Sequence, residues 1–243
     1  MLYLLFIPTF VSCTDLHLKT PPFFCFHHLN AYDDPNTDDI IIDMSIYPDS
    51  SVINLMRLEN LRDTNDVNKH MHLGRARRFR LKNVSNHDKP AVTSTQKAIE
   101  EFTLPQKYCI ELPTVNPTLY HKPYRFAYGL TKADDGTYTS FSDALVKLDM
   151  ASSSTEATHK VWHVPNQMPS EPIFVPSPRA TGEEGAEVED DGVLLSVVLD
   201  LARGKSALVV LDAKEMKEVG RAEMETVFPA GFHGFWSQKD VHP

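Results

Sequence analysis

Short apolar runs separated by turn residues recur along most of the 243-residue chain, and this pattern constrains the fold more than any other feature. β-Branched residues dominate the runs, several runs alternate apolar with polar residues, and Asp-Gly, Gly-Lys and proline-rich turns separate them. Strands are predicted at residues 39–47, 75–81, 124–128, 144–148, 160–164, 172–175, 193–199, 207–211 and 219–223. Many short strands with little helix indicate an all-β architecture, either propeller blades or a sandwich.

One segment departs from the strand pattern and follows helical spacing instead. Its apolar residues are Val52, Leu55, Met56 and Leu58. Residues three and four apart share one face of a helix, so we expect a short amphipathic helix over residues 52–61.

The first thirteen residues are apolar, but they are too few to span a bilayer as a helix. They also lack the basic segment that opens a signal peptide. A buried strand or a truncated start explains them better than a cleaved signal does. We therefore separate an atypical N-terminal segment, residues 1–20, from the strand-rich part, residues 21–243, in which no stretch has the length and apolarity of a transmembrane helix.

The chain is acidic, with a formal net charge of −9. This charge argues against nucleic acid as a partner, because the phosphates would be repelled. Residues 75–81 are basic, but arginines alternate there with Phe79 and Leu81, which indicates a half-exposed strand rather than a nucleic-acid patch. The three cysteines show neither zinc spacing nor a disulfide framework, so we expect a reducing, cytoplasmic compartment.

Two of the eleven histidines, His27 and His233, have apolar or glycine neighbours. His27 ends an aromatic-rich run, residues 22–26, and a turn is expected soon after it, at residues 30–33. Apolar walls hold a neutral imidazole still and keep water away, which suits a metal ligand, although a buried, hydrogen-bonded histidine is the alternative. We expect the two rings to meet at one metal ion. His28 points to the opposite face of a strand from His27, so at most one of that pair should reach the metal.

Two glutamates have unusually apolar neighbours. Glu111 lies between Ile110 and Leu112, just before a proline, and Glu171 lies in a proline-rich segment that leads into a β-branched run. A carboxylate is costly to bury unless it accepts a hydrogen bond, and the N–H of a metal-bound imidazole is a suitable donor. A solvent-exposed carboxylate at a strand end is the alternative for Glu111.

Several segments together resemble the carotenoid cleavage oxygenase family, and specifically its C-terminal half. The matching segments, in the family's order, are Phe23–Tyr32, Glu111–Pro117, Lys122–Gly129, Pro169–Pro176, Glu189–Val198 and Phe232–Gly234. The combination is highly specific, although no single segment would be.

The resemblance implies a seven-bladed β-propeller with a helical cap and a non-haem Fe(II) ion on the propeller axis. In the family, four histidines bind this iron and three glutamates hydrogen-bond to three of them. By motif, His27 matches the third ligand and His233 the fourth. Glu111 and Glu171 match two of the glutamates, and His28 stands one residue past the ligand position.

The chain departs from the family at its N-terminal end. The segment that carries the first two iron histidines, one glutamate and the first blades has no counterpart in residues 1–20. We therefore expect residues 21–243 to form an incomplete, C-terminal part of the propeller. Two imidazoles alone would bind iron weakly, and an open propeller leaves a bare sheet edge.

The resemblance implies a non-haem Fe(II) dioxygenase that uses dioxygen to cleave an alkene bond in a carotenoid or apocarotenoid. The implied ligand is an apolar polyene, and peripheral membrane contact is a further expectation. Two alternatives remain open: a stilbene-cleaving dioxygenase, and a catalytically inactive fragment that binds an apolar ligand.

Overall fold

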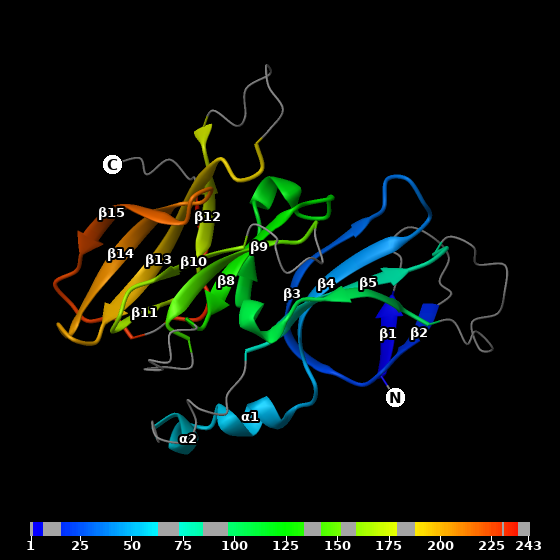
Figure 1. Ribbon diagram of the computed structural model, residues 1–243, viewed down its shortest axis with the longest axis horizontal. Helices are drawn as coiled ribbons and strands as arrows, with labels where there is room; N and C mark the ends of the chain where they lie inside the picture. Colours follow the sequence, from blue (N-terminus) through cyan, green and yellow to red (C-terminus); the bar gives the residue numbers. More distant parts are fainter. Residues whose placement is uncertain are drawn as a thin grey trace.

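The computed structural model describes residues 2–6, 16–62, 73–84, 97–133, 142–151, 159–178, 188–229 and 231–237. Three antiparallel sheets follow one another along the chain and lie side by side (Figure 1). A separate two-stranded ribbon, β1 (Leu2–Phe6) paired with β2 (Leu16–Thr20), precedes them. None of the helices in these residues has the length and apolarity needed to cross a membrane.

Each sheet is built from strands that are consecutive in the sequence. The first sheet contains β3 (Phe24–Asp33), β4 (Ile40–Tyr47), β5 (Arg75–Leu81) and β6 (Ile99–Thr103). The second contains β7 (Glu111–Thr114), β8 (Phe126–Thr131), β9 (Ala144–Asp149) and β10 (Lys160–His163). The third contains β11 (Gln167–Pro169), β12 (Ile173–Pro176), β13 (Gly192–Asp200), β14 (Lys205–Asp212) and β15 (Lys217–Glu223).

Successive four-stranded meanders of this kind are blades of a β-propeller, and in the described residues they form an open series rather than a closed ring. The prediction of an all-β, incomplete propeller is confirmed. The third sheet differs slightly, because β11 and β12 both pair with β13 and together occupy one strand position.

The two largest hydrophobic clusters in the described residues lie between neighbouring sheets. One cluster joins the first and second sheets and includes Leu29, Ala76 and Val146. Another joins the second and third sheets and includes Tyr128 and Phe174, whose ring centroids are 5.5 Å apart. Each sheet therefore buries its apolar residues against the next sheet, as stacked blades do.

The predicted helix over residues 52–61 is divided into α1 (Ser51–Leu55) and α2 (Leu58–Arg62). Val52 is buried and packs near Tyr47, whereas Leu58 is exposed, so the expected apolar face is not continuous. The described residues also contain two 3₁₀ turns, η2 (Gln106–Tyr108) and η3 (Pro117–Leu119).

The turn predicted at residues 30–33 is wrong, because β3 continues to Asp33. The amide of Asn30 is buried and forms hydrogen bonds outside its own sheet. Its Nδ2 donates to the carbonyl oxygens of Leu119 and Lys122, at 2.9 and 3.2 Å, and its Oδ1 accepts from the amide of His121. Asn30 thus joins the first sheet to the second instead of forming a turn.

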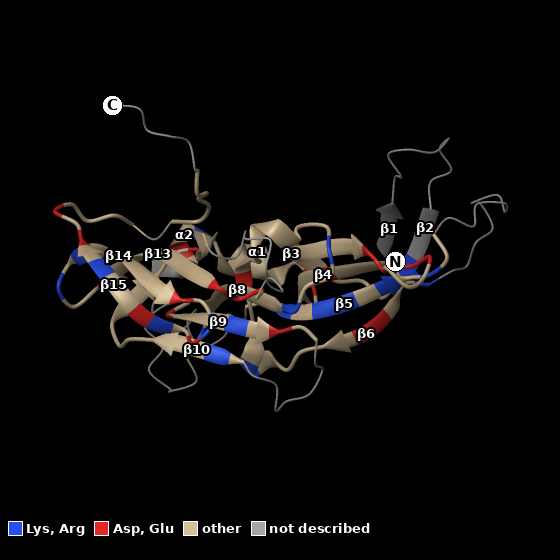
Figure 2. Cartoon of the chain, turned by 90° about the horizontal axis from the view of Figure 1, so that it is seen from above, with Lys and Arg blue, Asp and Glu red and all other residues tan. Residues whose placement is uncertain are grey.

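The basic segment is the half-exposed strand that its alternation predicted, and Figure 2 shows its basic positions on β5. Arg78 binds the buried carboxylate of Asp43 through two hydrogen bonds, at 2.8 and 2.7 Å. Arg80 binds Asp34 at 2.6 Å, and also Glu101. These arginines are neutralised within the fold.

Strand β8 begins at Phe126, two residues later than predicted. The backbone amides of Arg125 and Phe126 donate to the carboxylate of Glu189, and the hydroxyl of Tyr124 donates to Asp43 at 2.6 Å. The start of the predicted strand therefore also forms hydrogen bonds outside its own sheet, to Asp43 and Glu189, while the guanidinium of Arg125 binds Asp149 of β9.

Candidate metal centre

His27 lies in β3 where the pairing with β4 is irregular. The register shifts between Cys25 and His28 and again between His28 and Asn30. Bulges of this kind redirect side chains. The His27 side chain is 26% exposed, and its Nδ1 lies 2.6 Å from Oε2 of Glu111. His28 is exposed and is not part of this contact.

Glu111 begins β7 in the second sheet, and only 7% of its side chain is exposed. Its Oε1 accepts a hydrogen bond from Oγ of Ser45 at 2.9 Å. Its Oε2 accepts from the amide of Leu112 at 3.2 Å as well as from His27. Because a carboxylate only accepts, Nδ1 of His27 carries a proton, and in the neutral ring Nε2 is then the nitrogen whose lone pair can bind a metal. Glu111 is therefore not the solvent-exposed carboxylate of the alternative interpretation.

The backbone beside Glu111 is irregular. Leu112 has a φ of 46°, in the left-handed region that costs a leucine about 1–2 kcal/mol. The pairing of β7 with β8 shifts register between Glu111 and Thr114. Strain of this kind persists only where the surrounding structure holds it, and it is often found at functional sites.

Tyr47 also faces Glu111. Burial raises the pKa of the Tyr47 phenol, and the charge of Glu111 and a hydrogen bond to it raise this pKa further. The phenol therefore remains protonated beside the carboxylate.

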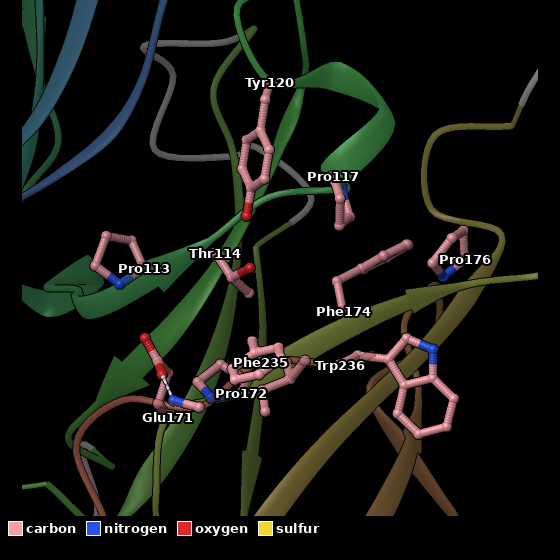
Figure 3. Close-up of a pocket in the computed structure, with 12 residues that line it drawn as sticks. Pro113, Thr114, Pro117, Tyr120, Glu171, Pro172, Phe174, Pro176, Phe235 and Trp236 are labelled. Carbon is pink, nitrogen blue, oxygen red and sulfur yellow. Dashed lines mark hydrogen bonds between the residues drawn. The ribbon is translucent and has the colours of Figure 1, made fainter. Parts of the chain in front are cut away.

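Glu171 and His233 form a second, more exposed pair. Glu171 lies in the gap between β11 and β12, and its Oε1 is 3.1 Å from Nδ1 of His233. Its Oε2 accepts from the amide of Gly234 at 2.8 Å (Figure 3). The side chain of Glu171 is 15% exposed and that of His233 is 64% exposed.

The two imidazoles lie next to each other. Their ring centroids are 5.3 Å apart and their planes make an angle of 67°. Both rings border a mainly apolar pocket of about 250 Å³, whose other lining residues include Phe26, Tyr47, Leu112 and Phe232. The pocket can therefore hold an apolar molecule beside the two histidines.

Each histidine takes its carboxylate from a different structural unit. His27 of the first sheet pairs with Glu111 of the second sheet. Glu171 of the third sheet pairs with His233, which follows that sheet in the chain. The four predicted residues are thus brought together as two His–Glu pairs, while their role at a metal stays a prediction.

The two pairs fit a metal such as iron in their donor chemistry. Metal-binding histidines commonly present one nitrogen to the metal while the other donates to a carboxylate, and both rings have this arrangement. Within the described part of the chain, however, no three His, Cys, Asp or Glu side chains gather as a metal site. The two histidines would therefore be a partial ligand set.

A second pocket, of about 400 Å³, borders the Glu171 segment (Figure 3). Proline and aromatic residues dominate its lining, among them Pro113, Pro117, Tyr120, Pro172 and Trp236. It borders Glu171 and Gly234, and it contains neither histidine.

Sequence reasoning missed Ser45 and Tyr47, which approach Glu111 from β4. A signal was present, because residues 40–47 form an apolar run that is interrupted by the polar residues Asp43 and Ser45. Both of these are fully buried. A polar residue within a buried strand needs a hydrogen-bond partner, but the sequence alone does not say which.

The chain is similar to several known proteins. Residues 11–238 match the family described as retinal pigment epithelial membrane protein. The chain is 33% identical over 235 residues to a torulene dioxygenase of Fusarium fujikuroi, covering 89% of this chain and 38% of that protein. It is 32% identical over 240 residues to a mitochondrial carotenoid-cleaving dioxygenase of Macaca fascicularis, covering 88% of this chain and 40% of that protein.

Among solved structures, a cobalt-substituted apocarotenoid oxygenase of Synechocystis is similar, with a TM-score of 0.70 and 25% identity. The similarity covers 97% of this chain and 44% of that structure. The chain therefore spans about two fifths of the length of the curated relatives described above.

Proposed function

The chain belongs to the retinal pigment epithelial membrane protein family, and on this premise we propose that it contributes to a non-haem Fe(II) centre for oxidative alkene cleavage. The proposed substrate is a carotenoid or apocarotenoid, with dioxygen as the second substrate. The observation that carries the proposal is the pair of adjacent imidazoles, His27 and His233, each with its Nδ1 on a separate carboxylate.

The chain's own residues have distinct roles in this proposal. Nε2 of His27 and Nε2 of His233 would bind the iron, while Glu111 and Glu171 keep each ring in the tautomer that leaves Nε2 unprotonated. Bound iron would supply the activation of dioxygen. The apolar pocket would exclude water and hold one double bond of a polyene beside the histidines, so that selectivity comes mainly from positioning.

The names of the relatives favour a carotenoid over a stilbene as the substrate, because the curated relatives described above are a torulene and a carotenoid-cleaving dioxygenase. The inactive alternative, a fragment that only binds an apolar ligand, differs in its metal chemistry. Iron binding therefore separates the two before any substrate is tested.

Iron stoichiometry tests the proposal. The full chain would be reconstituted anaerobically with Fe(II), in parallel with a His27→Ala, His233→Ala variant, and iron would be measured by elemental analysis. We expect weak binding that approaches one iron per chain in excess Fe(II) and is lost in the variant. A matched control is His28→Ala, which alters an exposed neighbour of His27 and should retain the metal.

Cleavage assays with carotenoid and stilbene substrates would follow on the iron-loaded chain. A folded chain that binds no iron, and whose iron content does not depend on His27 or His233, would contradict the proposal and favour the inactive alternative.

We also propose a cytoplasmic location with peripheral membrane contact. Exposed aromatic side chains near the C-terminal end, Phe232, Phe235 and Trp236, support this contact. Co-sedimentation with phosphatidylcholine vesicles should fall when Phe235 and Trp236 are both changed to Ser, and undiminished sedimentation would argue against it.

A further inference from the structure

The carboxylate of Glu111 is held by side chains from a strand that contributes no histidine to the centre. Ser45 and Tyr47 are two residues apart on β4, so they lie on the same face of that strand. Both are buried: the Ser45 hydroxyl donates to Glu111 of the neighbouring sheet at 2.9 Å, and Tyr47 borders the same pocket as this carboxylate.

Ser45 fixes both the carboxylate and the backbone beside it. Its Oγ is 2.9 Å from Oε1 of Glu111 and 2.6 Å from the carbonyl oxygen of Ile110. The hydroxyl has a single proton, which lies between these two acceptors. Rotation of the Glu111 carboxylate would move Oε1 away from Ser45 and Oε2 away from His27 at the same time.

Gly74 leaves the space in which this contact forms. A Cβ atom at position 74 would lie 2.0 Å from Oγ of Ser45 and 3.0 Å from Oε1 of Glu111. It would also lie 3.1 Å from the ring of Tyr47. Any side chain here would displace the hydroxyl of Ser45, so the absence of a side chain is part of the arrangement.

The second His–Glu pair is held differently. Oε2 of Glu171 accepts from a backbone amide, that of Gly234, and this glutamate is more exposed than Glu111. In the described residues, therefore, the His27 side of the centre is held by the buried Ser45 hydroxyl as well as by a backbone amide, and the His233 side by a backbone amide.

We propose that Ser45 and Tyr47 are positioning residues that fix the Glu111 carboxylate and, through it, the tautomer and orientation of the His27 ring. Only the consequence for metal affinity rests on the proposed function. The contacts themselves exist in the metal-free chain, so the inference has a readout that needs no metal.

The first readout is the tautomer of His27 in the metal-free full chain. Two-bond ¹H–¹⁵N spectra of histidine-labelled protein distinguish a proton on Nδ1 from one on Nε2, and a His27→Gln variant assigns the signal. We expect a single Nδ1–H tautomer in the wild-type chain. Ser45→Ala, Tyr47→Phe and the double variant should each show a mixture of tautomers.

Ser206→Ala is the matched control. Ser206 is as buried as Ser45, but its hydroxyl donates to the carbonyl oxygen of Phe228 at 3.1 Å, in the third sheet. Its removal should leave the His27 spectrum unchanged. Gly74→Ala keeps the Ser45 hydroxyl but displaces it, so the same mixture of tautomers is expected there.

The second readout is the affinity for Co(II) alone, measured by calorimetry. Loss of a group that orients a metal-binding histidine typically weakens metal binding by about 10–100-fold, and we expect about tenfold for Ser45→Ala. Tyr47→Phe carries the test if the other variants do not fold by circular dichroism.

The outcomes are distinguishable. An unchanged His27 tautomer in the folded Tyr47→Phe and Ser45→Ala variants would overturn the positioning inference. A second outcome is a fixed His27 tautomer in the wild-type chain that these variants disturb, with no Co(II) binding by the wild-type chain. That outcome would support the positioning inference and count against the proposed function.

Discussion

Glu111 and Glu171 make the same contact with a histidine but differ in their surroundings. Glu111 is enclosed by donors from two sheets, including the hydroxyl of Ser45 and the amide of Leu112. Glu171 lies at a break between two short strands and is bonded to a largely exposed ring. At the scale of single residues, the two carboxylates should therefore contribute differently to stability.

Glu111→Gln should lower the free energy of unfolding by about 1–3 kcal/mol. The glutamine side chain replaces one carboxylate oxygen with an NH₂ group, which would face a hydrogen-bond donor instead of accepting from it. Glu171→Gln should have a clearly smaller effect, since solvent reaches that site. Urea unfolding of both variants measures the difference. Equal losses would show that the burial of Glu111 does not matter to its interactions.

At the scale of the strand, the candidate site coincides with irregular pairing. The register of β3 shifts around His27, that of β7 shifts after Glu111, and Glu171 occupies the gap between β11 and β12. Regular strands alternate their side chains between two faces, whereas bulges redirect individual side chains. Irregular pairing thus accompanies three of the four candidate site residues.

The sequence predicted the regular strands well and the irregular ones poorly. Strands such as β4 and β13 are strongly apolar and were identified. Strand β6 (Ile99–Thr103) was missed, because it is a polar strand at the edge of its sheet with little apolar alternation. The prediction of a turn at Asn30 was wrong because Asn30 lies in a strand. Its side-chain amide donates to the carbonyl oxygens of Leu119 and Lys122, which are 89 or more residues away along the chain.

The candidate site was predictable only in part. His27, His233, Glu111 and Glu171 stood out by their apolar, glycine or proline neighbours, and the family motifs then implied hydrogen bonds between such glutamates and the metal-binding histidines. Ser45 has no such motif, since its contact depends on the way the second sheet docks against β4. Contacts between sheets are set by tertiary packing, which local sequence patterns do not encode.

The connection between β3 and β4 should respond to pH. A hydrogen bond from Arg80 holds the pKa of Asp34 below its ordinary value. The ionised carboxylate is therefore favoured in the folded state, so its contribution to stability is present above about pH 4 and is lost as the pH falls below that value. Asp34→Asn should reduce the pH dependence of the urea midpoint in this acidic range.

Asp33→Asn is the control, because Asp33 is an exposed neighbour at the end of β3. If Asp34→Asn and the wild-type chain lost stability equally on acidification, the ion pair with Arg80 would not contribute.

At the scale of the whole molecule, the sheets are joined by buried polar contacts as well as by shared cores. Tyr124 of the second sheet's leading segment donates to Asp43 of the first sheet, and Asn30 reaches the η3 segment. The carboxylate of Glu189 accepts from the amides of Arg125 and Phe126, where β8 begins. We therefore expect the described sheets to unfold together rather than one at a time.

Phe174→Ala tests this expectation. Phe174 is 2% exposed and packs between the second and third sheets, so its truncation should cost about 3–5 kcal/mol. Tryptophan fluorescence and far-UV circular dichroism should shift to lower urea by the same amount. A fluorescence transition that moves alone would show that the sheets unfold independently.

The histidine and the glutamate of each pair come from different structural units, and this has a consequence for how such a molecule can arise. A propeller grows by copying one blade and joining the copies in tandem. A copy of the first sheet would carry His27 without Glu111, and a copy of the third would carry Glu171 without His233. In this part of the molecule, a complete pair is a property of the junction between units, so it is inherited only when neighbours are copied together.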